Sequence, residues 1–317
     1  MARAQVFAMM AASAASAGES PLRPLEPLAQ ATPGLSPAQL DHVRELLRRA
    51  TGVALGAEKA YLIDGRLARV AREEGLQLDA LATRLIADAR AQALAVEALL
   101  NHETSFFRDW HPFEALREVV LPQLFAAAPP GRRVRIWSAA CATGQEPYSL
   151  AIMLREHFPA EAARVELLAT DVSEAALARA RAGSFTQLEV NRGLPTRLLF
   201  AHFRREGSRW VARPELQQMV TFRPLNLLRD PFPAPVDLLL LRNALIYFDL
   251  ATSRSILERA GAALAPGGRL VLGGAESTLA LGSDDFEVER LGKSLLYRLR
   301  PQQAGGQRAG GQQAGGR

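Results

Sequence analysis

The chain has 317 residues, of which 48% are hydrophobic and 22% charged, a balance typical of a globular protein with one or two domains. Its single cysteine, Cys141, excludes a disulfide framework and a cysteine-rich zinc site, and fits a reducing compartment such as the cytoplasm. The five histidines lack metal-ligand spacing, so no metal site is expected, and no apolar run reaches the roughly 18 residues that span a bilayer. The net charge of +5 is modest, so only clustered charge could steer a partner.

The two ends of the chain are predicted to lie outside the fold. Residues 1–35 are rich in Ala, Pro and Ser without periodicity, which predicts a disordered leader. The apolar run at 6–17 is short and alanine-rich, so a secretory signal is not favoured. Residues 301–317 form a low-complexity Gly/Gln-rich tail that is also predicted to be disordered.

Residues 36–100 have a helical pattern. Ser36 and Pro37 are typical of a helix start, apolar residues follow at helical spacing, and Gly52 is typical of a helix end. Further short helical stretches are separated by glycines, and no strand pattern occurs. The sequence therefore predicts a small all-helical N-terminal domain.

Residues 101–300 have a different pattern, in which short apolar runs alternate with helices. Strands buried on both faces and joined by helices indicate a mostly parallel α/β sheet. Residues 286–300 instead alternate in polarity about Gly292, which predicts an antiparallel pair. This Rossmann-like arrangement is common to class I methyltransferases. The four predicted parallel strands are 133–139, 164–171, 236–243 and 268–276, and helices are predicted at 147–158 and from about 252 to Pro266.

The first strand leads into a loop that contains only one glycine. Ala139, Ala140 and Ala142 keep the side chains small where a ligand would approach the backbone, and Gly144 can supply a turn with positive φ. Glu146 then begins the next helix, either as a ligand contact or as a simple helix cap. A nicotinamide dehydrogenase is excluded, because its loop needs more glycines to bring N–H groups to a pyrophosphate.

Two later strand ends carry polar residues. Asp171 ends the second strand, where a carboxylate can accept both ribose hydroxyls of a nucleoside, whereas Ser173 already suits the helix cap. Arg242 and Asn243 follow four leucines, a costly place for a charge unless a ligand or a neighbouring loop pairs with it. Tyr247 lies about one turn further on.

Residues 101–116 join the helical and α/β parts. Two polar residues there, Thr104 and Arg108, are poorly explained by packing, and the arginine could bind a ligand carboxylate with two hydrogen bonds. The aromatic residues between and after them are expected to fill a core: Phe106, Phe107, Trp110 and Phe113.

From about Ser36 to Arg300 the chain resembles the CheR family of chemotaxis receptor glutamate methyltransferases. The helical part looks like the family's N-terminal domain. Six later motifs occur in the family's order, namely "NHETSFFRD", "IWSAACATGQEPYSLAI", "LLATDVSEAALARARAGSF", "LNLL", "LLLRNALIYFD" and "GRLVLGGAEST". The resemblance implies a class I S-adenosylmethionine-dependent fold, with an all-α domain at 36–100, a catalytic domain at 101–300 and a small β-subdomain at about 192–222.

The resemblance also implies which residues hold S-adenosylmethionine and leave its product, S-adenosylhomocysteine. Thr104 and Arg108 would hold the methionine end and Asp171 the ribose. The family often has Asn two residues before the threonine, where this chain has His102. The other implied contacts are Glu146 at the first loop, Asn226 and Leu227 beside the adenine, Arg242 and Asn243 closing the pocket, and Tyr247 near the transferred methyl.

The chemistry implied by this resemblance is methyl transfer to a glutamate carboxylate. That carboxylate is ionised at neutral pH and is already a nucleophile, so the reaction needs positioning and exclusion of water rather than a strong base or a metal. This fits a sequence without a nucleophile–base pair. We assign the catalytic positioning roles to Arg108 and Tyr247.

The implied partner is the cytoplasmic helical domain of a chemoreceptor, without membrane insertion. Two basic clusters could meet it: residues 44–72 hold seven Lys/Arg against three acids, and residues 192–213 hold six arginines against one acid. The second lies in the region of the β-subdomain, where the family docks receptor tails. Its expected hairpin at 203–212, with Gly207 and Ser208 at the tip, is shorter than in members that grip a C-terminal peptide, so we expect methylation without such tethering.

Two alternatives remain. The chain could be a class I methyltransferase with another acceptor, including RNA, although only Phe200, Phe203 and Trp210 lie among the arginines as stacking candidates, so nucleic-acid binding is not expected. It could also be a non-catalytic scaffold that senses S-adenosylmethionine.

Overall fold

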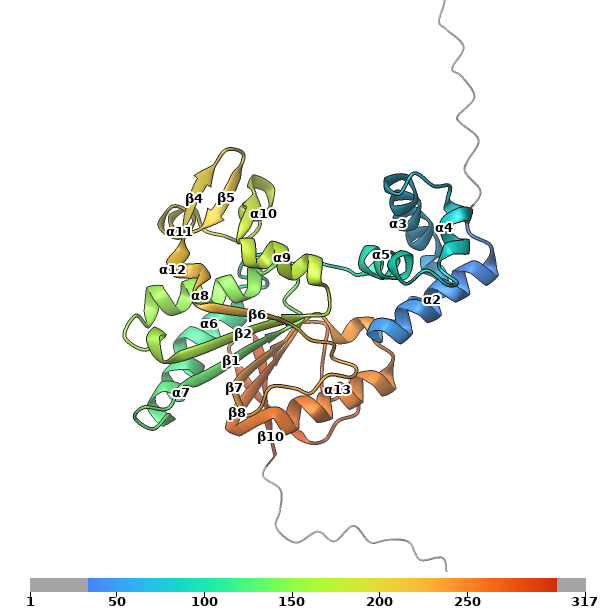
Figure 1. The fold of residues 1–317 in the computed structure, drawn as a ribbon. Helices are drawn as coiled ribbons and strands as arrows, with labels where there is room; N and C mark the ends of the chain where they lie inside the picture. Colours follow the sequence, from blue (N-terminus) through green and yellow to red (C-terminus); the bar gives the residue numbers. More distant parts are fainter. Residues whose placement is uncertain (1–33, 301–317) are drawn as a thin grey trace, which may run out of the picture. The chain divides into compact units, whose positions relative to one another are not determined.

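The computed structural model describes residues 34–300 (Figure 1). The leader predicted at 1–35, apart from its last two residues, and the tail predicted at 301–317 lie outside these described residues. None of the described helices combines the length and apolarity needed to cross a bilayer.

The helical domain begins at a well-formed cap. The Ser36 hydroxyl accepts from the Gln39 N–H, and the Gln39 side chain accepts in return from the Ser36 N–H. Gly52 ends this first helix with a φ of 83°, which glycine adopts without a Cβ clash. Its helices are α2 (Pro37–Thr51), η1 (Ala57–Lys59), α3 (Ala60–Glu73), α4 (Leu78–Arg84) and α5 (Ala89–Leu99).

The core of the helical domain is a single cluster of aliphatic side chains. Leu47, Ile63, Leu67 and Leu85 are completely buried in it. Because each helix presents its apolar stripe to this cluster, the domain has a hydrophobic core of its own.

The catalytic domain is built on a seven-stranded sheet with the order β6-β2-β1-β7-β8-β10-β9. Its first five strands in that order pair in parallel, and β10 and β9 are antiparallel, as predicted. The hairpin between β9 and β10 turns at Gly292. The strands are β1 (Val134–Ala139), β2 (Val165–Asp171), β6 (Val220–Pro224), β7 (Val236–Leu241), β8 (Leu264–Leu272), β9 (Phe286–Leu291) and β10 (Ser294–Leu299).

Two hydrophobic clusters cover the two faces of this sheet. In β7, Leu238 and Leu240 belong to one cluster and Leu239 and Leu241 to the other, as the alternation of side chains along a strand requires. Helix α13 (Leu250–Ala263) covers the second face (Figure 1). The first face is covered by α6 (His111–Ala115), η2 (Leu116–Val120), α7 (Leu121–Ala127), α8 (Gln145–His157) and α9 (Glu174–Ala182).

A second, three-stranded antiparallel sheet forms the β-subdomain, with the order β3-β5-β4. The predicted hairpin is present as β4 (Phe203–Glu206) and β5 (Arg209–Ala212), which turn at Gly207. Its third strand, β3 (Ser184–Thr186), lies before the predicted range of 192–222. Strand β6, which begins inside that range, pairs with β2 of the large sheet instead. The remaining elements of this region are α10 (Gln187–Asn191), α11 (Thr196–His202) and α12 (Pro214–Gln217).

Two further details differ from the sequence-based expectations. Helix α13 ends at Ala263, so Pro266 lies in β8 rather than at the end of the helix. Trp110, expected in the core with its aromatic neighbours, is 44% exposed, although its ring lies 5.3 Å from that of Phe107.

Candidate cofactor and methyl-transfer site

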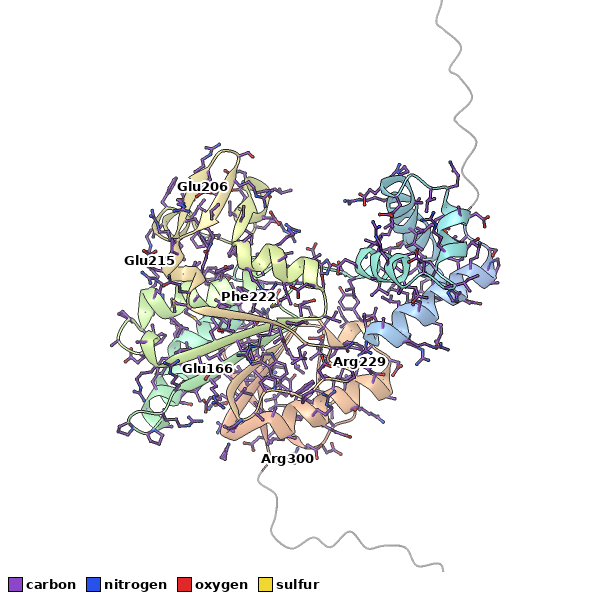
Figure 2. All side chains as sticks on the ribbon, viewed as in Figure 1. Glu166, Glu206, Glu215, Phe222, Arg229 and Arg300 are labelled. Atoms are coloured by element: carbon purple, nitrogen blue, oxygen red, sulfur yellow. The ribbon has the colours of Figure 1, made fainter. Side chains whose placement is uncertain are left out.

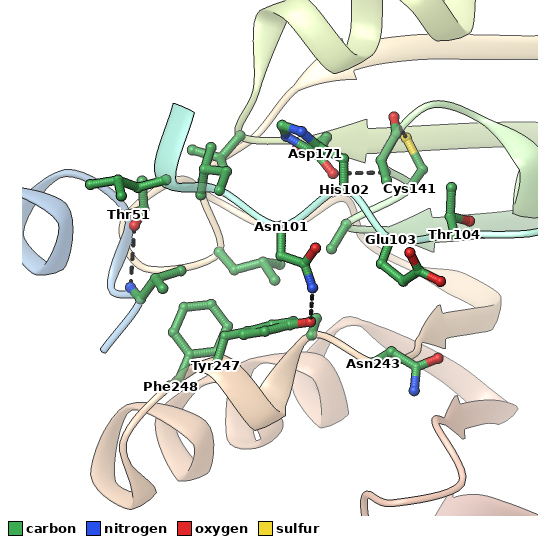
Figure 3. A pocket seen from close by; sticks show the side chains of 18 of the residues that line it. Thr51, Asn101, His102, Glu103, Thr104, Cys141, Asp171, Asn243, Tyr247 and Phe248 are labelled. Atoms are coloured by element: carbon green, nitrogen blue, oxygen red, sulfur yellow. Dashed lines mark hydrogen bonds between the residues drawn. The ribbon is translucent and has the colours of Figure 1, made fainter. Parts of the chain in front are cut away.

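A cavity of about 320 Å³ lies at the carboxyl ends of β1, β2 and β7 (Figure 3). This is where open α/β sheets bind their ligands, and the volume suits a small molecule. The helical domain supplies part of the wall through Thr51, Val53, Leu55, Lys59, Leu62 and Arg66.

The loop after β1 turns sharply through three residues with left-handed backbone, two alanines and one glycine. Ala140 and Ala142 have φ angles of 54° and 49°, and Gly144 has 97°. Left-handed backbone costs an alanine about 1–2 kcal/mol, so the surrounding contacts must hold it. A Cβ on Gly144 would lie 2.9 Å from the Cβ of Ala180 in α9, so a glycine is needed there on packing grounds as well.

Asp171 ends β2 and braces this loop. One carboxylate oxygen accepts from the Ala142 N–H at 2.8 Å and the other from the Ser173 N–H at 2.9 Å. Ser173 caps α9 with its own hydroxyl, so the aspartate is not the helix cap. Burial raises the pKa of Asp171 despite these two hydrogen bonds. Each oxygen keeps further acceptor capacity, and the residue lines the cavity.

Arg242 is the most buried charged side chain of the site, with 2% of the side chain exposed. Its guanidinium donates to Glu146 at 2.9 Å, to Asp109 at 2.8 Å and to the carbonyl of Arg108 at 2.9 Å. The Glu146 carboxylate also accepts from the Ser138 hydroxyl at 2.7 Å. Arg242 therefore connects the loop after β1 to the segment around residue 108. Of the two partners that the sequence left open for Arg242, a ligand or a neighbouring loop, the structure shows the neighbouring loop.

Residues 101–105 have no regular secondary structure and lead into a turn at 106–109, and five side chains of this segment line the cavity: Asn101, His102, Glu103, Thr104 and Arg108. The Asn101 amide donates to the Tyr247 hydroxyl oxygen (Figure 3). Arg108 donates to the carbonyl of Glu103 at 3.0 Å. Nε2 of His102 lies 3.8 Å from a Glu97 carboxylate oxygen and has no hydrogen-bond partner within residues 34–300. Thr104 lines the cavity beside them.

Tyr247 and Asn243 come from the turn after β7. Tyr247 ends the short helix η4 (Leu245–Tyr247), and its main-chain carbonyl accepts from the Ala54 N–H of the helical domain at 2.8 Å. Asn243 has a left-handed φ of 56°. Because the Tyr247 oxygen accepts from Asn101, its own O–H is free to donate towards the cavity.

Asn226 and Leu227 have different positions. Leu227 lines the cavity, whereas Asn226 is 6% exposed and does not. The Asn226 amide donates to the carbonyl of Ala50 at 2.7 Å and accepts from the Leu228 N–H at 2.9 Å. Arg229, which is labelled in Figure 2, donates to the same Ala50 carbonyl at 2.7 Å. Asn226 therefore joins the two domains at the end of α2.

The structure offers no activated nucleophile in the cavity among the described residues. Burial and the nearby carboxylates of Asp171 and Glu146 raise the pKa of the Cys141 thiol well above its usual value, so it stays protonated. The described part of the chain also contains no group of three or more His, Cys, Asp and Glu side chains that could hold a metal.

Comparison with known protein families shows the family to which this chain belongs. Residues 38–101 match the all-alpha domain of CheR methyltransferases, and residues 102–292 match their SAM-binding domain. The chain belongs to the CheR methyltransferase family. As a CheR methyltransferase it uses S-adenosylmethionine and methylates glutamates of chemoreceptors.

Full-length relatives are similar over both domains. Chemotaxis protein methyltransferase 1 of Pseudomonas aeruginosa is 36% identical over 83% of this chain and 98% of that protein. Chemotaxis protein methyltransferase Cher2 of Pseudomonas putida is 34% identical over 84% of this chain and 100% of that protein. Among solved structures, the glycopeptide N-methyltransferase MtfA bound to S-adenosylmethionine aligns with a TM-score of 0.32 and 12% identity, over 54% of this chain and 51% of that one. A structural similarity this low carries no weight here.

The CheR site contains residues that sequence reasoning did not assign. Asn101 was given no role, yet its side chain contacts Tyr247. Asp109 was not considered, yet it pairs with Arg242. No spacing rule predicts either contact, because each joins segments more than 130 residues apart in the chain. The sequence-predicted residues that line the cavity together are His102, Thr104, Arg108, Glu146, Asp171, Leu227, Arg242, Asn243 and Tyr247.

Proposed function

We propose that this CheR methyltransferase uses Tyr247 and Arg108 to position the receptor glutamate for methyl transfer. Both side chains line the cavity, and neither is held by an ion pair within residues 34–300. The observation that carries the proposal is the hydrogen bond from the Asn101 amide to the Tyr247 oxygen, which leaves the phenolic proton available to an incoming carboxylate.

The reaction asks the protein for alignment rather than proton transfer. S-adenosylmethionine supplies a methyl group bound to a positively charged sulfur. The glutamate carboxylate, ionised at neutral pH, needs to meet that methyl in line with the bond that breaks. A single hydrogen bond from Tyr247 would orient one carboxylate oxygen, and the other would stay free to react.

For the cofactor, we propose that Asp171 accepts hydrogen bonds from the ribose hydroxyls. Its carboxylate is fixed by the N–H groups of Ala142 and Ser173 and faces the cavity, which suits this donor pair. Thr104 and Arg108 would bind the methionine end, Leu227 would contact the adenine, and Glu146, Asn243 and His102 would complete the wall. Arg242 and Asn226 would act by holding these segments in place.

A labelling experiment tests the acceptor. The protein is incubated with methyl-labelled S-adenosylmethionine and membranes that contain chemoreceptors, and the label is then exposed to alkali. A glutamate methyl ester releases its label as methanol, so we expect alkali-labile label on the receptor band. Alkali-stable label would indicate a different acceptor, and no transfer at all would favour a sensing scaffold.

The receptor partner is proposed to bind without a C-terminal peptide tether, in the cytoplasm. The β-subdomain hairpin is short, with β4 and β5 joined through Gly207 and Ser208 (Glu206, which ends β4, is labelled in Figure 2). Two of its neighbouring arginines are already paired, Arg197 with Glu156 and Arg192 with Glu103. Titration with a receptor C-terminal peptide is expected to give no binding at micromolar concentration; micromolar affinity would refute this part.

A further inference from the structure

The Glu276 carboxylate is buried beside the turn that carries Asn243 and Tyr247. The residue is 8% exposed and follows β8, and it does not line the cavity. Within residues 34–300 its carboxylate has no ion-pair partner. A buried charge is costly unless it is well hydrogen-bonded, so its partners must lie in the main chain.

Four main-chain N–H groups donate to this one carboxylate. One oxygen accepts from Asn243 at 2.8 Å and from Gly273 at 2.7 Å. The other oxygen accepts from Leu245 at 2.8 Å and from Ile246 at 3.3 Å. Hydrogen bonds to a charged acceptor are about twice as strong as neutral ones, so together these bonds fix the course of the chain between β7 and η4.

The same contacts account for the backbone conformation of Asn243 and for the presence of a glycine at position 273. Asn243 adopts its left-handed φ at the point where its N–H meets the carboxylate. A Cβ on Gly273 would lie 2.6 Å from the Asn243 side-chain nitrogen and 2.8 Å from a Glu276 carboxylate oxygen. Only glycine therefore fits at position 273, directly after β8. The ends of β7 and β8 are therefore packed around the Glu276 carboxylate.

We propose that Glu276 is a positioning residue for methyl transfer. It sets the turn of residues 243–247 so that Asn243 and Tyr247 face the cavity. The inference rests on the proposed role of Tyr247. It gives the "GGAEST" segment, whose Glu276 does not line the cavity, the role of holding the turn that does.

The variant E276Q tests this assignment. Each carboxylate oxygen accepts from two N–H groups, so an amide in either orientation points its NH2 group at two of those donors. We expect kcat, expressed per site that binds S-adenosylhomocysteine, to fall about 10- to 100-fold, the size of loss that a displacement of about 1 Å can cause. The Kd for S-adenosylhomocysteine should change much less, because Asp171 lies on another strand.

The matched control is E258Q, which makes the same chemical change at an exposed position of α13. It should leave both kcat and Kd unchanged. If E276Q does not fold, as judged by circular dichroism, E276D keeps the charge while shortening the side chain and is measured in the same way.

A double-mutant cycle with Y247F separates positioning from general destabilisation. If Glu276 acts through Tyr247, the loss caused by E276Q shrinks in the Y247F background. Fully additive losses, or an E276Q enzyme with normal kcat, would overturn the role of Glu276. A Y247F enzyme with unchanged kcat would instead refute the proposed role of Tyr247, and with it the inference that rests on it.

Discussion

At the scale of single residues, Asp171 shows how one carboxylate can serve both the protein and its ligand. It closes the loop after β1 through Ala142 and begins the next helix through Ser173, and it still faces the cavity. The loop conformation and the proposed ribose contact therefore depend on the same side chain.

We predict that D171N weakens S-adenosylhomocysteine binding by about 10- to 100-fold, because hydrogen bonds to a charged group contribute about 1.5–3 kcal/mol. Isothermal titration calorimetry measures the change. E174Q, an exposed change three residues away in α9, is the control and should bind normally. Unchanged affinity in D171N would remove the ribose assignment.

The raised pKa of Asp171 gives a second prediction at this scale. Burial favours the protonated acid, whereas ribose hydroxyls donate to the ionised form, so affinity should be highest above this pKa and fall as the pH drops through it. Since the pKa is raised, the fall should begin at a higher pH than for an exposed aspartate. His102 and Glu97 also act on this carboxylate, so the wild-type pH profile of affinity is compared with that of D171N, in which the Asp171 contribution should disappear.

Residues at strand ends were the easiest to predict from the sequence. Asp171, Arg242 and Asn243 follow apolar runs, and a polar residue there needs a partner or a ligand. The sequence could not show that the two terminal nitrogens of the Arg242 guanidinium pair with Glu146 and Asp109, because those contacts depend on how loops meet in space. The sequence likewise could not show that the Asn226 amide binds the Ala50 carbonyl of the helical domain, because that contact also depends on how distant segments meet.

At the scale of elements, the loop from β1 to α8 relies on three left-handed residues, of which only Gly144 is a glycine. Parallel strands and their helices were predictable because buried apolar runs, caps and glycines encode them locally. The left-handed alanines were not, because the loop adopts that strained backbone only through contacts such as the bond from Ala142 to Asp171.

The loop gives a third prediction, made by comparing two glycine substitutions. G144A should lower the free energy of unfolding by at least about 2 kcal/mol and weaken cofactor binding, since it adds a clash with Ala180 to the cost of a left-handed φ. G131A has a similar φ of 81° and open space around it, so it should cost only about 1 kcal/mol and leave binding intact. Urea unfolding and calorimetry check both; equal effects would mean that the contact with α9 is unimportant.

At the scale of the whole molecule, the cavity is lined by both domains. Val53, Leu55 and Leu62 come from the helical domain, and Asn226 and Arg229 bind the end of α2 from the catalytic domain. Each domain could be predicted from the sequence by itself. The cavity wall that the two domains share could not, because local sequence patterns do not indicate which surfaces come into contact.

We therefore predict that S-adenosylhomocysteine slows hydrogen exchange in both domains. Peptides that cover residues 51–62 and 99–108 should gain protection together with those covering the β1 and β2 ends, since a ligand bound at saturating concentration stabilises every segment that closes on it. Peptides from β9, which is outside the cavity lining, serve as the internal control. Protection confined to residues 134–171 would contradict a cavity shared by the two domains.

The hydrogen bond from the Ala54 N–H to the Tyr247 carbonyl has a consequence for how this protein tolerates mutation. Both partners belong to the main chain, so replacing either side chain by another ordinary amino acid leaves the bond in place. Side-chain substitutions at these two positions therefore keep both the donor and the acceptor of this hydrogen bond. Only proline at position 54, which lacks the N–H, deletes the donor outright.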